Sequence, residues 1–170
     1  DLQNISEDDA IRHYNILVER TKENGFEHYE ISNFAKEGCR SQHNSIYWKD
    51  EKYLGLGASA HSYDGNSRQW NISNLTKYIQ LVGNSDDYFE KEILTKEDKF
   101  NEYVMTSLRT SWGCNVGKME TDYGEKYAVH FLKNVKKYLD SGIMLIKNNN
   151  YILTDEGMLF ADGIAADLFL

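Results

Sequence analysis

The chain of 170 residues contains no proline and only two cysteines. Two cysteines cannot build the disulfide framework that stabilises small secreted domains, so the composition favours a reducing compartment. No apolar run approaches the roughly 20 residues that span a bilayer. The first residues are acidic and polar, unlike a secretory signal. Together these absences predict a cytoplasmic protein without a transmembrane segment.

Positive charge is also scarce, with 19 lysines and arginines against 27 aspartates and glutamates and a net charge of −8. Residues 1–90 hold 9 basic and 15 acidic side chains, and residues 91–170 hold 10 and 12. Neither half has the positive excess that favours a phosphate backbone, so we predict no nucleic-acid partner. With 41% hydrophobic and 13% aromatic content, the chain can bury the core of one domain or two small ones.

Residues 28–63 gather polar, aromatic and glycine residues where an ordinary core would use aliphatic side chains. They contain the segments His28–Ala35 (HYEISNFA), His43–Trp48 (HNSIYW) and Gly55–Ser62 (GLGASAHS). Histidine can bind metals, aromatic rings offer flat surfaces, and glycine allows close approach of the backbone. The combination predicts a binding site for a planar aromatic ligand.

Three blocks carry a family resemblance: Tyr29–Ala35, His43–Trp48 of the form H-N-x-x-Y-W, and Gly55–Ser62 of the form G-x-G-x-x-A-H-S. In this order and spacing they resemble the HemW-type haem chaperones. These are relatives of oxygen-independent coproporphyrinogen III oxidase, within the radical SAM enzymes. The resemblance implies a protein that holds haem or another porphyrin and delivers haem to an acceptor protein. It also implies a [4Fe–4S] cluster and S-adenosylmethionine in the full-length protein.

The cysteines of this chain do not match the family's cluster motif. The family holds its cluster on three cysteines of a C-x-x-x-C-x-x-C motif near the N-terminus, whereas this chain has only Cys39 and Cys114 and begins at Asp1 without an initiator methionine. We therefore expect the C-terminal segment of a longer protein. On that interpretation the segment alone holds no cluster and cannot cleave S-adenosylmethionine. Both cysteines are interpreted as plain thiols.

The N-terminal part of the chain has the pattern of an α/β unit. A capping-box-like start at Ser6 opens an amphipathic helix that stops at Asn24-Gly25, and residues 26–34 are predicted to form one strand. Helix followed by strand is the repeating step of a parallel barrel. Residues 1–70 are therefore predicted to form the C-terminal edge of a radical SAM (β/α) barrel together with the site loops.

The loops of this part are expected to carry the site. Residues 35–50 are predicted to be irregular, and residues 52–60 to form a short buried strand broken by glycine. A turn is predicted at Asp64-Gly65-Asn66. Residues 71–92 are predicted to be a connecting segment, with a short helix that ends at Gly83-Asn84.

The pattern changes at residues 93–170, where helical periods alternate with a hairpin signal. Thr95 begins one helix, a second helix runs to Ser141-Gly142, strands on either side of residues 147–150 form a hairpin, and Thr154 caps a final helix through Leu168. Helix, helix, hairpin and helix outline a winged-helix-like domain, as in the C-terminal domain of the resembled family. The predicted fold class is thus α/β plus α+β.

His43 is the first candidate for binding haem iron. The resemblance implies this role, because His43 is the histidine of the H-N-x-x-Y-W block. Tyr47 and Trp48 lie close by in the chain and would contact the porphyrin face. The alternative is an ordinary loop histidine that is hydrogen-bonded to the backbone.

Gly55, Gly57 and His61 resemble a cofactor loop. A tight turn that needs glycine, with a histidine that satisfies a buried carbonyl, is the alternative explanation. The resemblance also implies that Ala35 lies near an S-adenosylmethionine, since family members that bind two such molecules contact the second through the alanine after this phenylalanine. Their other contact is aliphatic where this chain has Arg109, which argues against a second S-adenosylmethionine.

Three functions follow from these observations. The first is haem binding and delivery. The second is radical decarboxylation of coproporphyrinogen III, against which the H-N-x-x-Y-W block argues. The third is a winged-helix interaction module without a cofactor, in which the loop aromatics only pack. A basic strip of Lys133, Lys136 and Lys137 is interpreted as a solvated helix face, because the predicted hairpin tip carries neutral asparagines. We assign no catalytic residue.

Overall fold

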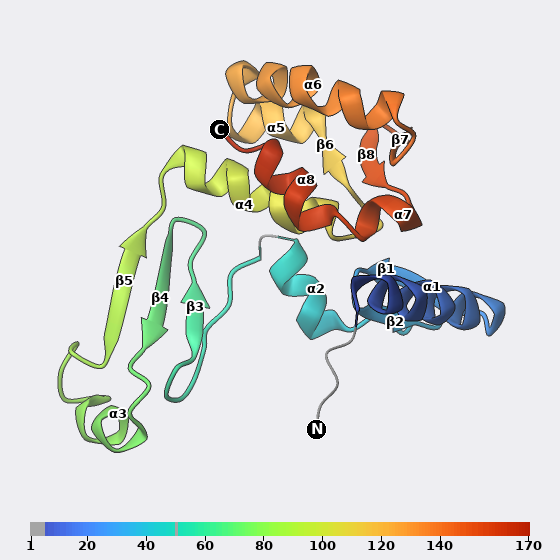
Figure 1. The fold of residues 1–170 in the computed structure, drawn as a ribbon. Helices are drawn as coiled ribbons and strands as arrows, with labels where there is room; N and C mark the ends of the chain where they lie inside the picture. The colour runs from blue at the N-terminus through green and yellow to red at the C-terminus, as the bar shows by residue number, and fades with distance from the viewer. Residues whose placement is uncertain (1–5, 50) are drawn as a thin grey trace.

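The structure is a computed structural model that describes residues 6–49 and 51–170. Its elements form three groups along the chain (Figure 1). The first group contains α1 (Glu7–Glu23), β1 (Glu27–Glu30), β2 (Asn33–Ala35) and α2 (Gln42–Trp48). The second contains β3 (His61–Tyr63), β4 (Ser67–Asn71), α3 (Leu75–Leu81) and β5 (Phe89–Ile93). The third contains α4 (Lys96–Leu108), β6 (Cys114–Asn115), α5 (Val116–Asp122), α6 (Glu125–Asp140), β7 (Met144–Lys147), β8 (Asn150–Leu153), α7 (Asp155–Met158) and α8 (Ala161–Asp167).

Helix α1 confirms the prediction for the start of the chain. The Ser6 side chain accepts a hydrogen bond from the Asp9 backbone N–H and caps the helix. The helix gives way at Asn24, and Gly25 follows with a φ of +72°, which glycine adopts without strain. The side chain of Val18 is buried but that of Leu17 is 49% exposed, so α1 covers the neighbouring sheet with a narrow stripe.

The single strand predicted for residues 26–34 is wrong. These residues form an antiparallel hairpin in which His28 pairs with Phe34 and Glu30 pairs with Asn33. The Glu30 carboxylate accepts hydrogen bonds from the Ser32 backbone and hydroxyl, and such side-chain bonds turn the chain back on itself. Every strand pair within the described residues is antiparallel, so the predicted parallel barrel edge is not visible in this segment.

Two further predictions for the N-terminal half are also wrong. Residues 42–48 are helical rather than irregular, because Ser41 caps α2 by accepting from the Asn44 backbone N–H. The prediction ended at Asp50, which lies outside the described residues. Residues 52–60 are not a buried strand, since Leu54 and Leu56 are 76% and 80% exposed and Tyr53 alone makes a bridge, to Tyr63.

The second group is built on an antiparallel sheet of order β3-β4-β5, which the sequence did not predict. The turn at Asp64-Gly65-Asn66 is confirmed and joins β3 to β4, with the Asp64 carboxylate accepting from the backbone N–H of Ser67. Helix α3 is confirmed, but its apolar residues Leu75 and Ile79 are exposed. Residues 71–92 thus contain α3 together with the end of β4 and most of β5.

The third group follows the predicted order most closely. Thr95 and Asp98 form the capping box of α4, and the buried side chains of that helix recur at helical spacing: Phe100, Tyr103, Val104, Ser107 and Leu108. The hairpin β7–β8 turns at Asn148 and Asn149, both at positive φ as a tight two-residue hairpin turn requires. The predicted last helix is instead two helices, α7 and α8, separated at Leu159 and Phe160. Strand β6 and helix α5 were not predicted.

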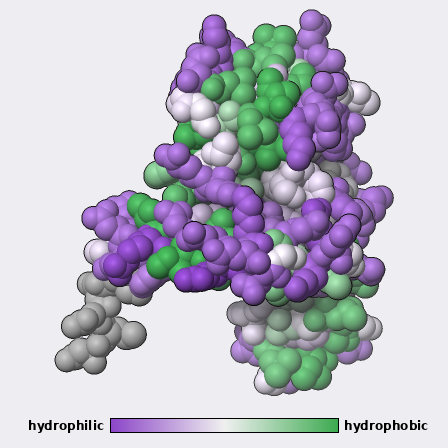
Figure 2. Space-filling model, turned by 90° about the vertical axis from the view of Figure 1, so that its right-hand side faces the viewer, coloured by the Kyte–Doolittle hydropathy of each residue, from purple (hydrophilic) through white to green (hydrophobic). Residues whose placement is uncertain are grey.

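The main hydrophobic core lies inside the third group, where α4, α5, α6 and α8 pack around an antiparallel sheet of order β6-β8-β7. Hydrophobic side chains are also exposed at the upper and lower ends of the molecule (Figure 2). The upper end is the third group and the lower end is the region of α3 (Figure 1). None of the helices within residues 6–49 and 51–170 is long and apolar enough to cross a membrane.

Candidate functional site

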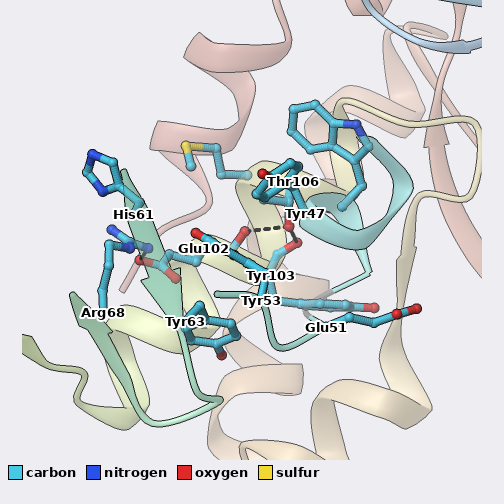
Figure 3. A pocket seen from close by; sticks show the side chains of 11 residues that line it. Tyr47, Glu51, Tyr53, His61, Tyr63, Arg68, Glu102, Tyr103 and Thr106 are labelled. Atoms are coloured by element: carbon cyan, nitrogen blue, oxygen red, sulfur yellow. Dashed lines mark hydrogen bonds and ion pairs between the residues drawn. The ribbon is translucent and has the colours of Figure 1, made fainter. Parts of the chain in front are cut away.

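A pocket of about 310 Å³ opens between α2, β3, β4 and α4 (Figure 3). Five of its lining side chains are aromatic, and they come from α2, β3, α4 and the segment before β3: Tyr47, Trp48, Tyr53, Tyr63 and Tyr103. Its polar wall includes His61, Arg68 and Glu102. Flat apolar walls with a few polar groups are typical of sites for planar ligands.

Helix α2 supplies Tyr47 and Trp48 to the pocket, while His43 stands one turn away. The Tyr47 hydroxyl lies 3.2 Å from Nε2 of His43, and the two rings meet edge to face at 5.2 Å. On its other side the Tyr47 ring contacts Tyr53 at 4.7 Å. His43 is exposed and does not line the pocket itself, so Tyr47 connects it to the cavity.

Strands β3 and β4 supply the opposite wall. His61 pairs with Trp70 and Tyr63 pairs with Arg68, so all four side chains lie on one face of the sheet. Arg68 forms an ion pair with Glu102 of α4 and thereby ties the sheet to the third group. Figure 3 shows His61 and Arg68 next to one another on this wall, across the pocket from Tyr47.

Gly55 and Gly57 shape the segment in front of this sheet and do not line the pocket. A Cβ on Gly55 would come within 2.1 Å of the His61 carbonyl oxygen, so the backbone passes too close for any side chain. Gly57 has a φ of +105°, and its carbonyl accepts from Nδ2 of Asn71. These contacts support the tight turn as the reason for both glycines. Their contact with a cofactor stays a prediction.

Ala35 and the cysteines lie apart from the pocket. Ala35 is buried at the end of β2, where it pairs with Glu27. Cys39 is exposed, whereas Cys114 is fully buried, and burial raises the pKa of the Cys114 thiol. The described part of the chain contains no group of three or more metal-binding side chains. The residues present therefore do not fit a [4Fe–4S] cluster.

Glu30 is a buried charged residue that was not among the predicted site residues. Its carboxylate is fully buried and accepts hydrogen bonds from Ser32, Asn33 and Arg109. Burial alone would raise the pKa of Glu30, but the hydrogen bonds from Asn33 and Ser32 and the nearby Arg109 guanidinium outweigh burial and hold the pKa below its usual value. No local pattern marked it, because its partner Arg109 lies 79 residues further along the chain.

Comparisons with known proteins show which proteins the chain is similar to. Residues 94–160 match the family described as the HemN C-terminal domain. The chain is 31% identical over 152 residues to the heme chaperone HemW of Bacillus subtilis, covering 89% of this chain and 40% of that protein. The predicted resemblance is confirmed. The heme chaperone HemW of Lactococcus lactis is 26% identical over 159 residues, covering 94% of this chain and 42% of that protein.

A solved structure shares the fold. The coproporphyrinogen III oxidase HemN of Escherichia coli, a radical SAM enzyme, superposes with a TM-score of 0.72 at 18% identity. The match covers 96% of this chain and 42% of that one. Like the two HemW proteins, this relative is therefore matched over about two fifths of its length.

Proposed function

We propose that this chain is the C-terminal part of a tetrapyrrole-handling radical SAM protein that binds haem and delivers it to an acceptor protein. The observation that carries the proposal is the similarity to the heme chaperone HemW of Bacillus subtilis over 89% of the chain. The cluster and S-adenosylmethionine belong to the full-length protein in this proposal. We also propose that the full-length protein is cytoplasmic.

The aromatic pocket suits one edge of a porphyrin. Its volume of about 310 Å³ is at the lower end of the roughly 300–1,000 Å³ of ligand pockets, so a large planar ligand would enter by an edge and remain partly outside. Trp48 and Tyr53 offer rings for its faces, and two histidines lie within reach of this region: His61 in the wall and His43 beside Tyr47. We propose His43 as the ligand of the haem iron.

Replacing His43 with alanine in the full-length protein should weaken haem binding at least about tenfold, which corresponds to about 1.4 kcal/mol. The fold should be retained, since an exposed side chain with one hydrogen-bonding neighbour contributes less than about 1 kcal/mol to the free energy of unfolding. Titration with haem followed by the Soret band measures the affinity, and circular dichroism checks the helices.

His61→Ala is the matched comparison, because His61 is exposed as well but stands in the pocket wall. If His61→Ala loses haem while His43→Ala binds it like the wild type, the iron ligand is His61 and our assignment is wrong. If both variants bind haem as tightly as the wild type, neither histidine is the iron ligand.

The second candidate function is oxidative decarboxylation of coproporphyrinogen III. The shared fold with the Escherichia coli oxidase is compatible with it, but at 18% identity that likeness concerns the fold alone. The product separates the two functions. Haem that is bound and released without any decarboxylation of coproporphyrinogen III supports the chaperone, and turnover of coproporphyrinogen III supports the oxidase.

We further propose that residues 93–170 form a winged-helix-like domain, with residues 1–70 at the edge of a barrel and residues 71–92 between them. The order α4, β6, α5, α6, β7, β8 supports this assignment, as does the antiparallel sheet of order β6-β8-β7, in which β7 and β8 make the wing. In this proposal the domain serves structure or protein binding.

The domain should not bind duplex DNA. Of the basic strip on α6, Lys137 is already paired with Asp167. The hairpin tip carries Asn148 and Asn149 instead of the basic residues of a DNA-contacting wing. Fluorescence anisotropy with a labelled duplex should show no submicromolar binding. Salt-dependent binding that is weakened by joint substitution of Lys133, Lys136 and Lys137 with alanine would contradict this expectation.

We do not extend the proposal to a second S-adenosylmethionine. The family contact would need an aliphatic side chain where Arg109 stands. Here the Arg109 guanidinium forms ion pairs with Glu30 and Asp162.

A further inference from the structure

Glu30 is a buried carboxylate that accepts hydrogen bonds from three residues of this chain, Ser32, Asn33 and Arg109. Its side chain is 1% exposed. One oxygen accepts from the Ser32 backbone N–H and hydroxyl, each at 3.0 Å, and from Nδ2 of Asn33. The other oxygen accepts from Nη2 of Arg109 at 3.2 Å. A buried charge is tolerated only with partners of this kind, so the arrangement is unlike a surface ion pair.

Both members of the ion pair reach helix α2, which carries His43, Tyr47 and Trp48. From Glu30 the path runs through Asn33, whose Oδ1 accepts from Nδ2 of Asn44 at 3.0 Å in the first turn of α2. From Arg109 the contact is direct, because the guanidinium carbon lies 5.6 Å from the centre of the Trp48 ring in the last turn. The pair therefore holds α2 near both ends.

The pair also lies where the first group meets the third. The backbone N–H of Ile31 donates to the Arg109 carbonyl, and the N–H of Ser111 donates to the Tyr29 carbonyl, both at 3.0 Å. Glu30 and Thr110 form an isolated antiparallel bridge between these bonds. Residues 29–31 and 109–111 are thus fixed to each other by the backbone, and the Glu30–Arg109 pair is held in place from both sides.

Helix α2 depends on such contacts for its orientation. It has seven residues, and helices of this length are not stable alone in water. Its only buried residue is the small Ser45, so hydrophobic packing fixes it weakly. Polar, cation–π and ring contacts therefore do much to set which way Tyr47 and Trp48 point, and the Glu30–Arg109 pair supplies such contacts at both ends.

We propose that Glu30 and Arg109 are positioning residues that orient α2 so that Tyr47 and Trp48 form the aromatic wall of the pocket. The consequence for haem rests on the proposed function. The orientation of α2 does not, because it follows from contacts that exist without a ligand.

Asp162 provides a matched control. Nη1 of the same Arg109 lies 2.7 Å from Oδ1 of Asp162, but the Asp162 side chain is 78% exposed, whereas that of Glu30 is 1% exposed. Exposed ion pairs contribute little to stability, so Asp162→Asn removes one charged partner of Arg109 without disturbing the buried Glu30–Arg109 pair.

The test measures amide hydrogen exchange of residues 42–48 in the full chain without haem. Exchange should be at least tenfold faster in Glu30→Gln and Arg109→Met than in the wild type and Asp162→Asn, while residues 125–140 of α6 exchange equally in all four. Unchanged exchange of α2 in Glu30→Gln and Arg109→Met would overturn the proposal. If either variant also loses protection in α6, its effect on α2 is not specific, and Arg109→Lys is measured instead. Lysine keeps the positive charge but lacks the planar guanidinium that contacts both Glu30 and Trp48, so α2 should again exchange faster than in the wild type. Wild-type exchange of α2 in Arg109→Lys would likewise overturn the proposal.

Haem titration of the same variants in the full-length protein gives the functional consequence. We expect at least tenfold weaker binding for Glu30→Gln and Arg109→Met and wild-type binding for Asp162→Asn. If the wild type itself binds no haem, the proposed function fails, and hydrogen exchange still decides the positioning role.

Discussion

Replacing Gly55 with alanine should distort the β3 side of the pocket and cost at least about 2 kcal/mol in the free energy of unfolding of that sheet, as forced overpacking does. The added Cβ would meet the His61 carbonyl oxygen at 2.1 Å, and that oxygen belongs to the backbone of a paired strand. A flexible side chain could move aside, but a strand can relieve the clash only by shifting. Because His61 is in the pocket wall, the haem binding that we propose should weaken along with stability.

Gly163→Ala is the control for this substitution. Gly163 lies in α8 with nothing within 4 Å of an added Cβ, so alanine there should stabilise the helix by roughly 0.5–1 kcal/mol. Chemical denaturation followed by tryptophan fluorescence, in which Trp70 of β4 reports on the sheet, measures both variants. Wild-type stability of Gly55→Ala would show that the close approach of Gly55 to His61 is not present in solution.

Phe131→Ala should destabilise the third group by about 3–5 kcal/mol, the usual cost of removing a fully buried phenylalanine side chain. Phe131 has no exposed surface, and its ring meets that of Tyr151 edge to face at 5.3 Å. The cavity would open between α6 and β8, at the centre of the main core. Urea unfolding followed by circular dichroism measures the loss.

The neighbouring residue on the same helix is the matched control. Leu132 is 40% exposed, so Leu132→Ala removes an apolar side chain of similar class from α6 without opening a buried cavity, and it should cost less than about 1 kcal/mol. Equal losses in the two variants would mean that Phe131 is not in the core.

The helices of the third group could be predicted because their apolar residues recur at helical spacing over long segments. In α4 the pattern and the Thr95 cap agree, and both are confirmed. The short elements could not be predicted in this way. Strand β6 has two residues, and the sequence of α5 contains Gly117 and only two apolar side chains of any size, Val116 and Met119. The break at Phe160 was also missed: Phe160 precedes α8 with a φ of −114° and makes no side-chain cap hydrogen bond that would mark a helix start.

Part of the composition of the pocket could be predicted from the sequence, but its geometry could not. Tyr47, Trp48 and His61 line one pocket, although Trp48 and His61 are 13 positions apart in the chain, whereas His43, Gly55 and Gly57 do not line it. Helix α2 was missed because it has only seven residues, the first four of which are polar, and its cap is the single Ser41 side chain. Arg68 and Glu102 were missed because their meeting depends on how β4 packs against α4, and pairing between such distant residues leaves no mark on either local sequence.

The uneven distribution of buried apolar side chains has a thermodynamic consequence. The third group holds most of them, while β3, β4 and β5 contribute Tyr63 alone. Such a chain need not unfold in one all-or-none step, and calorimetry would report mainly the transition of the third group. The less cooperative sheet is also the one that borders the pocket. A ligand bound there would raise the transition temperature of the sheet by mass action and bring the two transitions together.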